Sequence, residues 1–222
     1  TQQRRSAEEK AGHTPNRRRA TGEEVHGSPY RKGEVNYYNE FDPFAAQWLR
    51  NLIAEKLIPA GDVDERDIRK VQGADLKGYT QCHFFAGIGG WPLALQLAGW
   101  HPDRPVWTGS CPCQPFSLAG KHKGEADERH LWPEFLRLYA ERRPAIALGE
   151  QVASPDGRRW LAGVRADLEA IGSRFAAADL CAAGVGAPHI RQRLYWVADA
   201  ERDPIDPRWP SDEPGEGAGA AQ

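Results

Sequence analysis

Short runs of β-branched and aromatic residues alternate along this chain with segments whose apolar residues recur at helical spacing. The runs lie at residues 35–39, 81–86, 106–108, 145–148, 175–180 and 194–198, and the helical segments begin after 42 and cover 93–98, 131–142 and 158–171. This alternation is typical of an α/β sheet whose strands are joined by crossover helices. Asp42 is placed to cap the first helix, with Pro43 at its first position.

The two ends of the chain differ from this middle in composition. Residues 1–33 hold eight Lys/Arg and four Glu, and residues 199–222 hold seven acidic residues and two Arg among Pro and Gly. Such segments bury too little apolar surface to offset the entropy lost on ordering. We expect a disordered basic arm over 1–33, a compact domain over 34–198 and a disordered acidic tail over 199–222. The arm could contact phosphates, although a solvated tail or a vector remnant is the simpler interpretation.

Cysteine usage, hydropathy and net charge exclude several classes of protein. Four cysteines in 222 residues are too few for a disulfide-dense secreted scaffold and fit a reducing, cytoplasmic setting. No apolar run is long enough to span a bilayer, so no membrane partner is expected. The net charge of -2 gives no general basic surface for nucleic acid, which must therefore be inferred from a site. Methionine is absent even at position 1, so we expect a fragment or a processed chain, with a monomer as the default oligomeric state.

Two motifs whose residues could bind a ligand or take part in a reaction follow predicted strands. Residues 85–90 read Phe-Ala-Gly-Ile-Gly-Gly, a turn where absent Cβ atoms let the backbone approach a ligand, although tight packing explains it equally well. Residues 111–117 read Cys-Pro-Cys-Gln-Pro-Phe-Ser, in which a cysteine is either a nucleophile facing a cleft or a buried structural residue. Cys111 and Cys113 are too close for the usual zinc spacing, so no metal is expected. Ligands of open α/β sheets bind outside the carboxyl ends of the strands, where these motifs lie.

Together, these motifs resemble those of the DNA cytosine-5 methyltransferases. Four motifs occur in the family's order: Phe-Ala-Gly-Ile-Gly-Gly at 85–90, Pro-Cys-Gln-Pro-Phe-Ser at 112–117, Gly-Glu-Gln-Val at 149–152 and Pro-His-Ile-Arg-Gln-Arg at 188–193. The resemblance covers about residues 35–198. It implies a Rossmann-like, S-adenosylmethionine-dependent methyltransferase fold of prokaryotic or phage type. The implied sheet is mostly parallel and doubly wound, with a C-terminal antiparallel hairpin.

The resemblance also implies a permuted order of strands. The family's acidic residues for the cofactor ribose and adenine follow the glycine turn, but the segment from Gly90 to Cys113 is too short to hold them. Two upstream segments resemble the missing ones, Asn-Glu-Phe-Asp-Pro-Phe-Ala at 39–45 and Gly-Asp-Val-Asp-Glu-Arg-Asp-Ile at 61–68. We infer that the second and third strands precede the first, which still permits a sheet ordered 3-2-1-4-5.

The residues that the resemblance assigns to S-adenosylmethionine come from both parts of this permuted chain. Glu40 would bind the ribose hydroxyls, or would act only as a carboxylate at a helix N-terminus. Asp67 or Asp62 would meet the adenine, and Asp67 is preferred because Asp-Ile-Arg matches the family better, although a loop turn explains either residue. The complete set is Phe85, Ala86, Gly87, Ile88, Gly89, Glu40, Phe41, Asp67, Ile68 and Pro112.

The same resemblance assigns catalytic roles to four residues. The Cys113 thiolate would add to C6 of a flipped cytosine, and Glu150 would hold the N3 and N4 edge and donate a proton. Arg191 and Arg193 would bind the base O2 or the flanking phosphate. A salt-bridged surface Glu and two solvent-facing Arg are the alternatives. The expected substrate contacts are Gln114, Ser117 and Gln151.

Departures from the family pattern leave other functions open. His83 stands where an Asp is common, Gln151 replaces an Asn and His189 replaces a Gln. We recognise no target-recognition domain after Ala198. The leading interpretation is a DNA cytosine-5 methyltransferase, with a catalytically silent module that binds DNA or a partner, or an RNA cytosine-5 methyltransferase, as alternatives.

Overall fold

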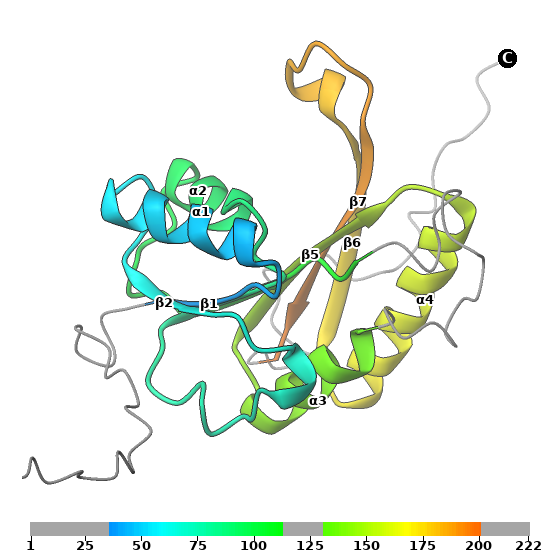
Figure 1. Ribbon diagram of the computed structural model, residues 1–222. Coiled ribbons are helices and arrows are strands. Elements are labelled where there is room, and N and C mark those ends of the chain that lie inside the picture. Colours follow the sequence, from blue (N-terminus) through cyan, green and yellow to red (C-terminus); the bar gives the residue numbers. More distant parts are fainter. Residues whose placement is uncertain (1–35, 113–130, 201–222) are drawn as a thin grey trace, which may run out of the picture.

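Seven strands form one sheet in the order β2-β1-β3-β4-β5-β7-β6 in the computed structural model, which describes residues 36–112 and 131–200 (Figure 1). The first five strands in this order are parallel, and β7 and β6 are antiparallel to their neighbours. The strands are β1 (Asn36–Asn39), β2 (Gly61–Asp64), β3 (Gln81–Phe84), β4 (Val106–Gly109), β5 (Ile146–Val152), β6 (Arg174–Cys181) and β7 (Gln192–Asp199).

The strand order confirms the permuted arrangement inferred from the sequence. Strand β3 leads into the glycine turn and is therefore the first strand of the family order, while β1 and β2 are the second and third. The observed order β2-β1-β3-β4-β5 is thus the predicted 3-2-1-4-5. The fold class is also confirmed, because the parallel sheet ends in the predicted antiparallel hairpin, formed by β6 and β7.

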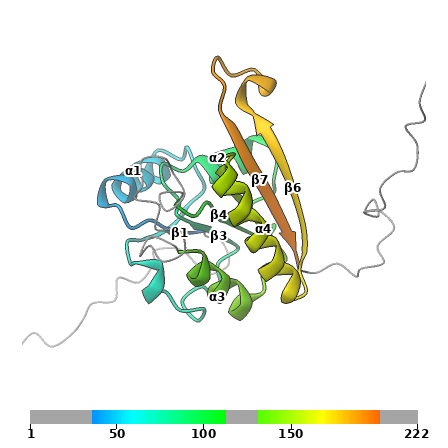
Figure 2. The same cartoon turned by 90° about the vertical axis from the view of Figure 1, so that its right-hand side faces the viewer.

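Four helices cover the two faces of this sheet (Figures 1 and 2). Helices α1 (Pro43–Ala54) and α2 (Gly90–Leu97) lie on one face, and α3 (Trp132–Arg142) and α4 (Pro155–Ala170) lie on the other. The predicted cap is confirmed, since Asp42 accepts a hydrogen bond from the Ala45 amide and Pro43 begins α1. Ser154 caps α4 in the same way.

Alternating side chains of the strands divide the core into two layers. Tyr37 belongs to the larger apolar cluster, which the sheet forms with α3, α4 and the short helix η1 (Ile68–Lys70). Its neighbour Tyr38 points the opposite way and packs with Leu49 and Ile58 below α1. The larger layer is rich in aromatic rings, among them Phe84, Trp107, Trp132, Phe135 and Trp196.

Several details differ from the sequence-based expectations. Strand β5 does not stop at Leu148 but continues to Val152, because β7 pairs with it as far as the Val152–Arg193 register. Free cysteines are most often core residues, and Cys82 is buried, whereas Cys181 is only half-buried at the end of β6. Phe44 and Trp48 share the apolar periodicity of α1 yet are 78% and 45% exposed. Within the two described ranges, no helix is long and apolar enough to cross a membrane.

Candidate functional site

The carboxyl ends of β1, β2, β3 and β4 surround a cavity of about 540 Å³, which we call the edge cavity. This volume lies within the range of about 300–1,000 Å³ typical of small-ligand sites. Six of the predicted cofactor residues line it. The lining consists of Asn39, Glu40, Phe41, Asp42, Asp67, Ile68, Arg69, Phe85, Ser110, Pro112 and Leu131.

Glu40 links the two halves of the edge cavity. Its Oε1 accepts a hydrogen bond from the Asp42 amide at 2.9 Å, and its Oε2 accepts one from the Gly87 amide at 2.7 Å. The carboxylate is therefore held between the end of β1 and the glycine turn after β3. Each carboxylate oxygen has a second lone pair, so Glu40 can still accept hydrogen bonds from two hydroxyl groups.

The residues of the glycine turn differ in their surroundings. Phe85 has a φ of 52° and Gly87 a φ of 55°, and this left-handed backbone accompanies the sharp change of direction after β3. Phe85 lines the edge cavity, whereas Ala86 packs in the core below α1. A Cβ at Gly89 would lie 3.3 Å from Leu52 of α1, so this glycine permits close helix packing. Ile88, also predicted to bind the cofactor, is 69% exposed and does not line the cavity.

Of the two candidate acids for the adenine, only Asp67 lines the edge cavity. Its carboxylate is held by the Arg69 guanidinium, with hydrogen bonds of 3.0 and 2.8 Å. This pairing with Arg69 keeps the pKa of Asp67 below its ordinary value, so the group is a carboxylate at neutral pH. Asp62 instead accepts a 2.6 Å hydrogen bond from the Tyr79 hydroxyl and lies outside the cavity lining.

Sequence reasoning missed several residues that shape the cavity. Asn39 donates to the backbone oxygens of Asp64 and Arg66 at 3.1 and 2.8 Å, which fixes the chain after β2 beside β1. Ser110 accepts a 2.9 Å hydrogen bond from the Trp91 indole. The position of Asn39 directly before Glu40 was an available signal, but the partners of both side chains depend on contacts between distant segments.

Glu150 and Arg193 meet on neighbouring strands. Strand β7 runs beside β5, and the Arg193 Nε forms an ion pair with the Glu150 Oε1. The two side chains are 18% and 27% exposed, so the pair is partly accessible to solvent. Arg191, the other predicted arginine, is exposed beyond the start of β7. The structure thus brings Glu150 and Arg193 together and leaves Arg191 apart from them.

Gln151 points into the interior next to Glu150. Its side chain is 1% exposed, and its Oε1 accepts a hydrogen bond from the Val152 amide. Its Nε2 has no hydrogen-bond partner within the described part of the chain. The predicted residues Cys113, Gln114 and Ser117 lie outside the described residues.

Burial distinguishes Cys111 from a reactive cysteine. The Cys111 side chain is 5% exposed, and desolvation raises the pKa of its thiol well above the ordinary value. Because the thiolate is the reactive form, Cys111 is a packing residue of the core. This leaves Cys113 as the candidate nucleophile of the Cys-Pro-Cys motif.

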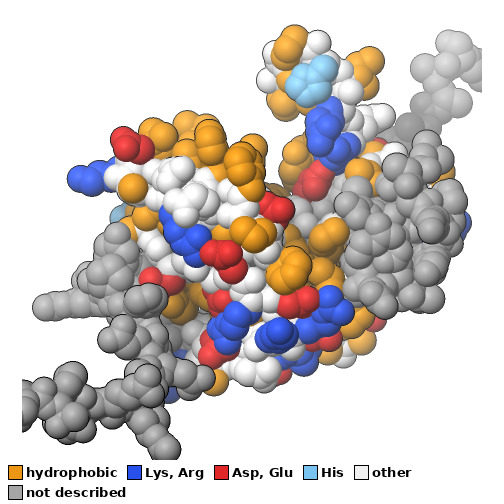
Figure 3. Space-filling view, in the orientation of Figure 1, with side chains coloured by type: hydrophobic (Ala, Val, Ile, Leu, Met, Phe, Trp, Pro, Cys, Tyr) orange, Lys and Arg blue, Asp and Glu red, His pale blue; other side chains and the backbone are white. Residues whose placement is uncertain are grey.

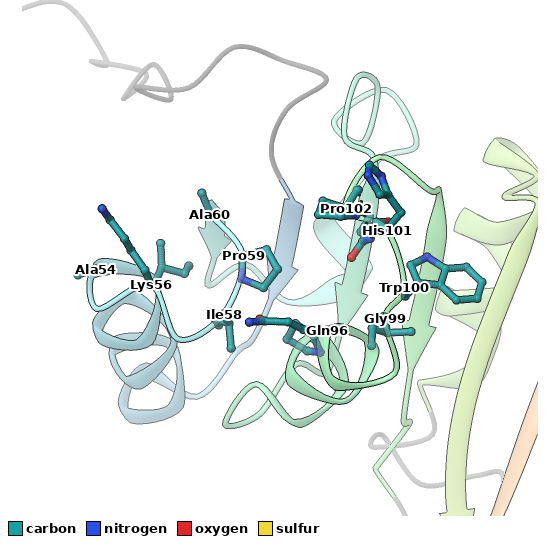
Figure 4. A pocket seen from close by; sticks show the side chains of 14 residues that line it. Ala54, Lys56, Ile58, Pro59, Ala60, Gln96, Gly99, Trp100, His101 and Pro102 are labelled. Carbon is teal, nitrogen blue, oxygen red and sulfur yellow. Dashed lines mark hydrogen bonds between the residues drawn. The ribbon is translucent and has the colours of Figure 1, made fainter.

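A second cavity, of about 730 Å³, lies at the opposite edge of the sheet (Figure 4). The ends of α1 and α2 form its walls, with Ile58, Pro59 and Trp100 among its lining residues. It contains none of the predicted site residues. Over residues 36–112 and 131–200, no three His, Cys, Asp or Glu side chains gather as metal ligands would.

Comparison with known proteins gives one matching family. The model of the C-5 cytosine-specific DNA methylases matches residues 22–213. A Type II methyltransferase, M.AplI of Arthrospira platensis, is 38% identical over 100 residues, covering 44% of this chain and 28% of the relative. M.HhaI of Haemophilus parahaemolyticus, also a Type II methyltransferase, is 27% identical over 167 residues, covering 58% of this chain and 51% of the relative. The chain therefore spans about half or less of the length of these relatives.

A solved structure supports the assignment of the fold. A DNMT2 mutant of Spodoptera frugiperda superposes with a TM-score of 0.50 at 17% identity. The superposition covers 80% of this chain and 44% of the DNMT2 chain. At this identity, the similarity concerns the fold alone.

Proposed function

Since this chain belongs to the C-5 cytosine-specific DNA methylase family, we propose that it methylates C5 of cytosine in DNA with S-adenosylmethionine as methyl donor. The observation that carries the proposal is the Glu40 carboxylate bonded to the Gly87 amide at 2.7 Å. This contact joins segments 47 positions apart in the chain and closes one cavity from the permuted halves.

The edge cavity offers acceptors that suit the ribose and adenine groups of S-adenosylmethionine. Glu40 would accept hydrogen bonds from both ribose hydroxyls, as acidic residues do in dinucleotide folds. Asp67 would accept one from the adenine amino group, since its oxygens keep lone pairs beside Arg69. Phe41 is 68% exposed at the rim and would cover the adenine ring with its own. Bound S-adenosylmethionine supplies the electrophilic methyl group that the activated C5 accepts.

Covalent activation of the base is the task of Cys113 and Glu150. The Cys113 thiolate would add to C6, and the electron pair of the C5–C6 double bond would become available at C5 while N3 takes a proton from Glu150. Arg193 would stabilise the carboxylate that Glu150 becomes. Loss of the C5 proton to a water molecule and elimination of the Cys113 thiolate, with return of the N3 proton to the Glu150 carboxylate, would then release 5-methylcytosine. A duplex target must first be flipped out of the base stack.

Transfer of a labelled methyl group to cytosine-containing DNA tests the proposal. We expect the unmodified chain to form 5-methylcytosine and Cys113→Ala to form none. Glu40→Gln replaces the charged carboxylate with a neutral amide of nearly the same shape. We expect this change to weaken the binding of S-adenosylmethionine about tenfold or more. Glu65→Gln is the matched control, because Glu65 pairs with Arg50 on the surface and does not line the edge cavity.

Each result separates one part of the proposal from another. Full activity of Cys113→Ala would contradict the covalent mechanism. Unchanged cofactor binding by Glu40→Gln would contradict the assembled cofactor site but not the catalytic assignment. Cofactor binding without methyl transfer by the unmodified chain would mean that transfer needs a target-recognition part in addition to these residues. The absence of both cofactor binding and transfer would support the catalytically silent alternative, and transfer to RNA alone would support the RNA methyltransferase.

A further inference from the structure

The β6–β7 hairpin extends past the sheet on the side where the parallel strands end (Figures 1 and 2). Strand β5 pairs with β7 only as far as Arg193, whereas β6 still pairs with β7 at the Cys181–Gln192 register. Residues 182–191 continue beyond both strands, and we call them the hairpin tip. The tip therefore stands on the same edge as Glu150 and the edge cavity.

Backbone hydrogen bonds give the hairpin tip a defined shape. The Ala182 amide donates to the Arg191 oxygen at 3.1 Å, and the Ala187 amide donates to the Ala182 oxygen at 3.0 Å. The short helix η4 (Ala182–Val185) ends at Gly186, whose φ of 93° turns the chain back. Side chains on the tip are thus presented on a folded element.

Two β-branched side chains lie at the end of this element. Val185 is 80% exposed and Ile190 is 83% exposed, among the highest values for large apolar residues in the described part of the chain. Figure 3 shows hydrophobic side chains and a His at the end of the hairpin, with Lys or Arg side chains next to them. Apolar side chains that gather at the exposed end of a projecting element are candidates for contact with another molecule.

The charged residues near these two side chains indicate which kind of molecule the hairpin tip would contact. Residues 182–193 contain no Asp or Glu, but they contain Arg191, Arg193 and the exposed His189. An apolar end that lies next to Arg191 and has no acidic side chain complements a polyanion with an apolar interior, which describes stacked nucleic-acid bases between phosphates.

The position of the tip matches the place that a flipped base leaves. Glu150 of β5 lies opposite Tyr195 of β7 in the sheet. Tyr195 follows Arg191 by four positions in the chain. At about 3.3 Å per residue, Arg191 lies roughly 13 Å beyond the Glu150 level and Ile190 slightly farther. A base held at Glu150 has left its stack, so the vacated position lies away from Glu150, and the hairpin tip projects from the same end of the sheet (Figure 1).

We propose that Val185 and Ile190 form an apolar wedge that enters the base stack beside the flipped cytosine, with Arg191 on a neighbouring phosphate. This inference rests on the proposed function and adds to it the group that opens the duplex. Other DNA-binding proteins use Ile, Leu or Phe to unstack bases in this way.

The test compares a stacked target with one that is already unstacked. Bisulfite sequencing of DNA treated with the unmodified chain identifies the methylated site, and two duplexes of that site are made. One is fully paired, and the other has an abasic position opposite the target cytosine, which lowers the energy needed for flipping. The variant is Val185→Ala combined with Ile190→Ala. The matched control is Leu57→Ala combined with Leu97→Ala, because these side chains are 55% and 79% exposed on the α1 and α2 side.

We expect the wedge variant to methylate the paired duplex about tenfold more slowly or worse, and the abasic duplex at nearly the unmodified rate. Its midpoint of thermal unfolding should not change, since both side chains are exposed. Equal rates on the paired duplex, or the same loss on both duplexes, would overturn the wedge.

A binding measurement separates this inference from the proposed function. If the unmodified chain binds DNA without methylating it, its binding site is identified by selection from random duplexes, and affinities for the paired and abasic forms of that site replace the rates. The variant should then lose affinity for the paired duplex only, and equal affinities would overturn the wedge. A chain that binds neither duplex overturns both proposals.

Discussion

The ion pair between Arg193 and Glu150 is half-buried where β5 ends and β7 begins, so its effect should fall on chemistry rather than on cofactor binding. We expect Arg193→Gln to lower the single-turnover methylation rate by roughly 100-fold, as the loss of one preorganised donor commonly does. The dissociation constant of S-adenosylmethionine, measured by calorimetry, should change less than about twofold. Arg165→Gln is the control, because Arg165 pairs with Glu169 on the exposed surface of α4. A parallel loss of cofactor affinity would show that Arg193 acts on the edge cavity instead.

Buried His83 predicts a pH dependence of stability. Its Nδ1 lies 2.9 Å from the Thr108 hydroxyl, and desolvation lowers the pKa of the ring to about 3. In the unfolded chain the pKa is about 6.5, so between these values the unfolded state binds one proton more than the folded state. The contribution of His83 to the free energy of unfolding should therefore be fully present above about pH 6.5, and it should be lost progressively as the pH falls below that value.

Comparison with His83→Asn isolates this contribution from those of the carboxylates. Asn keeps a polar group near Thr108 and does not titrate. Between pH 6.5 and 5, urea unfolding should show the unmodified chain losing up to about 1.4 kcal/mol per pH unit more than the variant. Identical pH slopes for the two proteins would mean that His83 becomes protonated without leaving the folded state.

At the scale of elements, two glycines should respond oppositely to the same substitution. A Cβ at Gly149 in β5 would lie 2.3 Å from the Trp196 ring, which packs among Trp132, Phe135 and Phe175. Gly149→Ala should therefore lower the free energy of unfolding by about 1–3 kcal/mol, the usual effect of overpacking. Gly163→Ala in α4 meets nothing within 4 Å and should raise it by about 0.5–1 kcal/mol. Chemical denaturation of both variants measures the difference, and a destabilised Gly163→Ala would contradict the reasoning.

Elements whose ends depend on local chemistry could be predicted from the sequence. The Asp42-Pro43 pair specifies the start of α1 without any tertiary contact. The end of β5 could not be predicted, because Gly149, Glu150 and Gln151 have little strand propensity and are held in the sheet by β7. Similarly, the periodicity of α1 predicts a helix but not that Phe44 stays exposed, since exposure depends on what packs there.

The candidate site, like the fold, could be predicted from the sequence only in part. The resemblance to the family assigned Glu40 and Asp67 to one cofactor pocket, and the structure places both in the lining of the edge cavity. The choice between Asp67 and Asp62 needed the structure, because only the fold shows which carboxylate reaches the cavity. The contribution of Asn39 was likewise inaccessible, since its partners lie 25 and 27 positions away.

For the whole molecule, the order of strands in the sheet is independent of their order in the chain. Strand neighbours are set by packing, so the β1 and β2 segments occupy the second and third places although they come first in the chain. Asn36 and Asp199 both lie at the amino edge of the parallel strands, because Asp199 pairs with Ile146 at the start of β5. Four strand spacings separate β1 from β7, which places these residues about 19 Å apart.

A circular permutant should therefore move the β1 and β2 segments from the start to the end of the chain without changing the sheet. Joining Gln222 to Thr1 leaves 57 residues to connect Ala200 with Asn36, far more than 19 Å requires at about 3.3 Å each. New ends between Lys77 and Gly78 fall in an exposed turn, where Gly78 has a φ of 92°. We expect the circular dichroism of this permutant to match that of the original chain, with S-adenosylmethionine affinity within about threefold, since exposed turns tolerate new ends. A permutant opened between Trp107 and Thr108 inside β4 is the control and should not fold. If the first permutant also fails to fold, the chain order of β1 and β2 is itself needed to build the sheet.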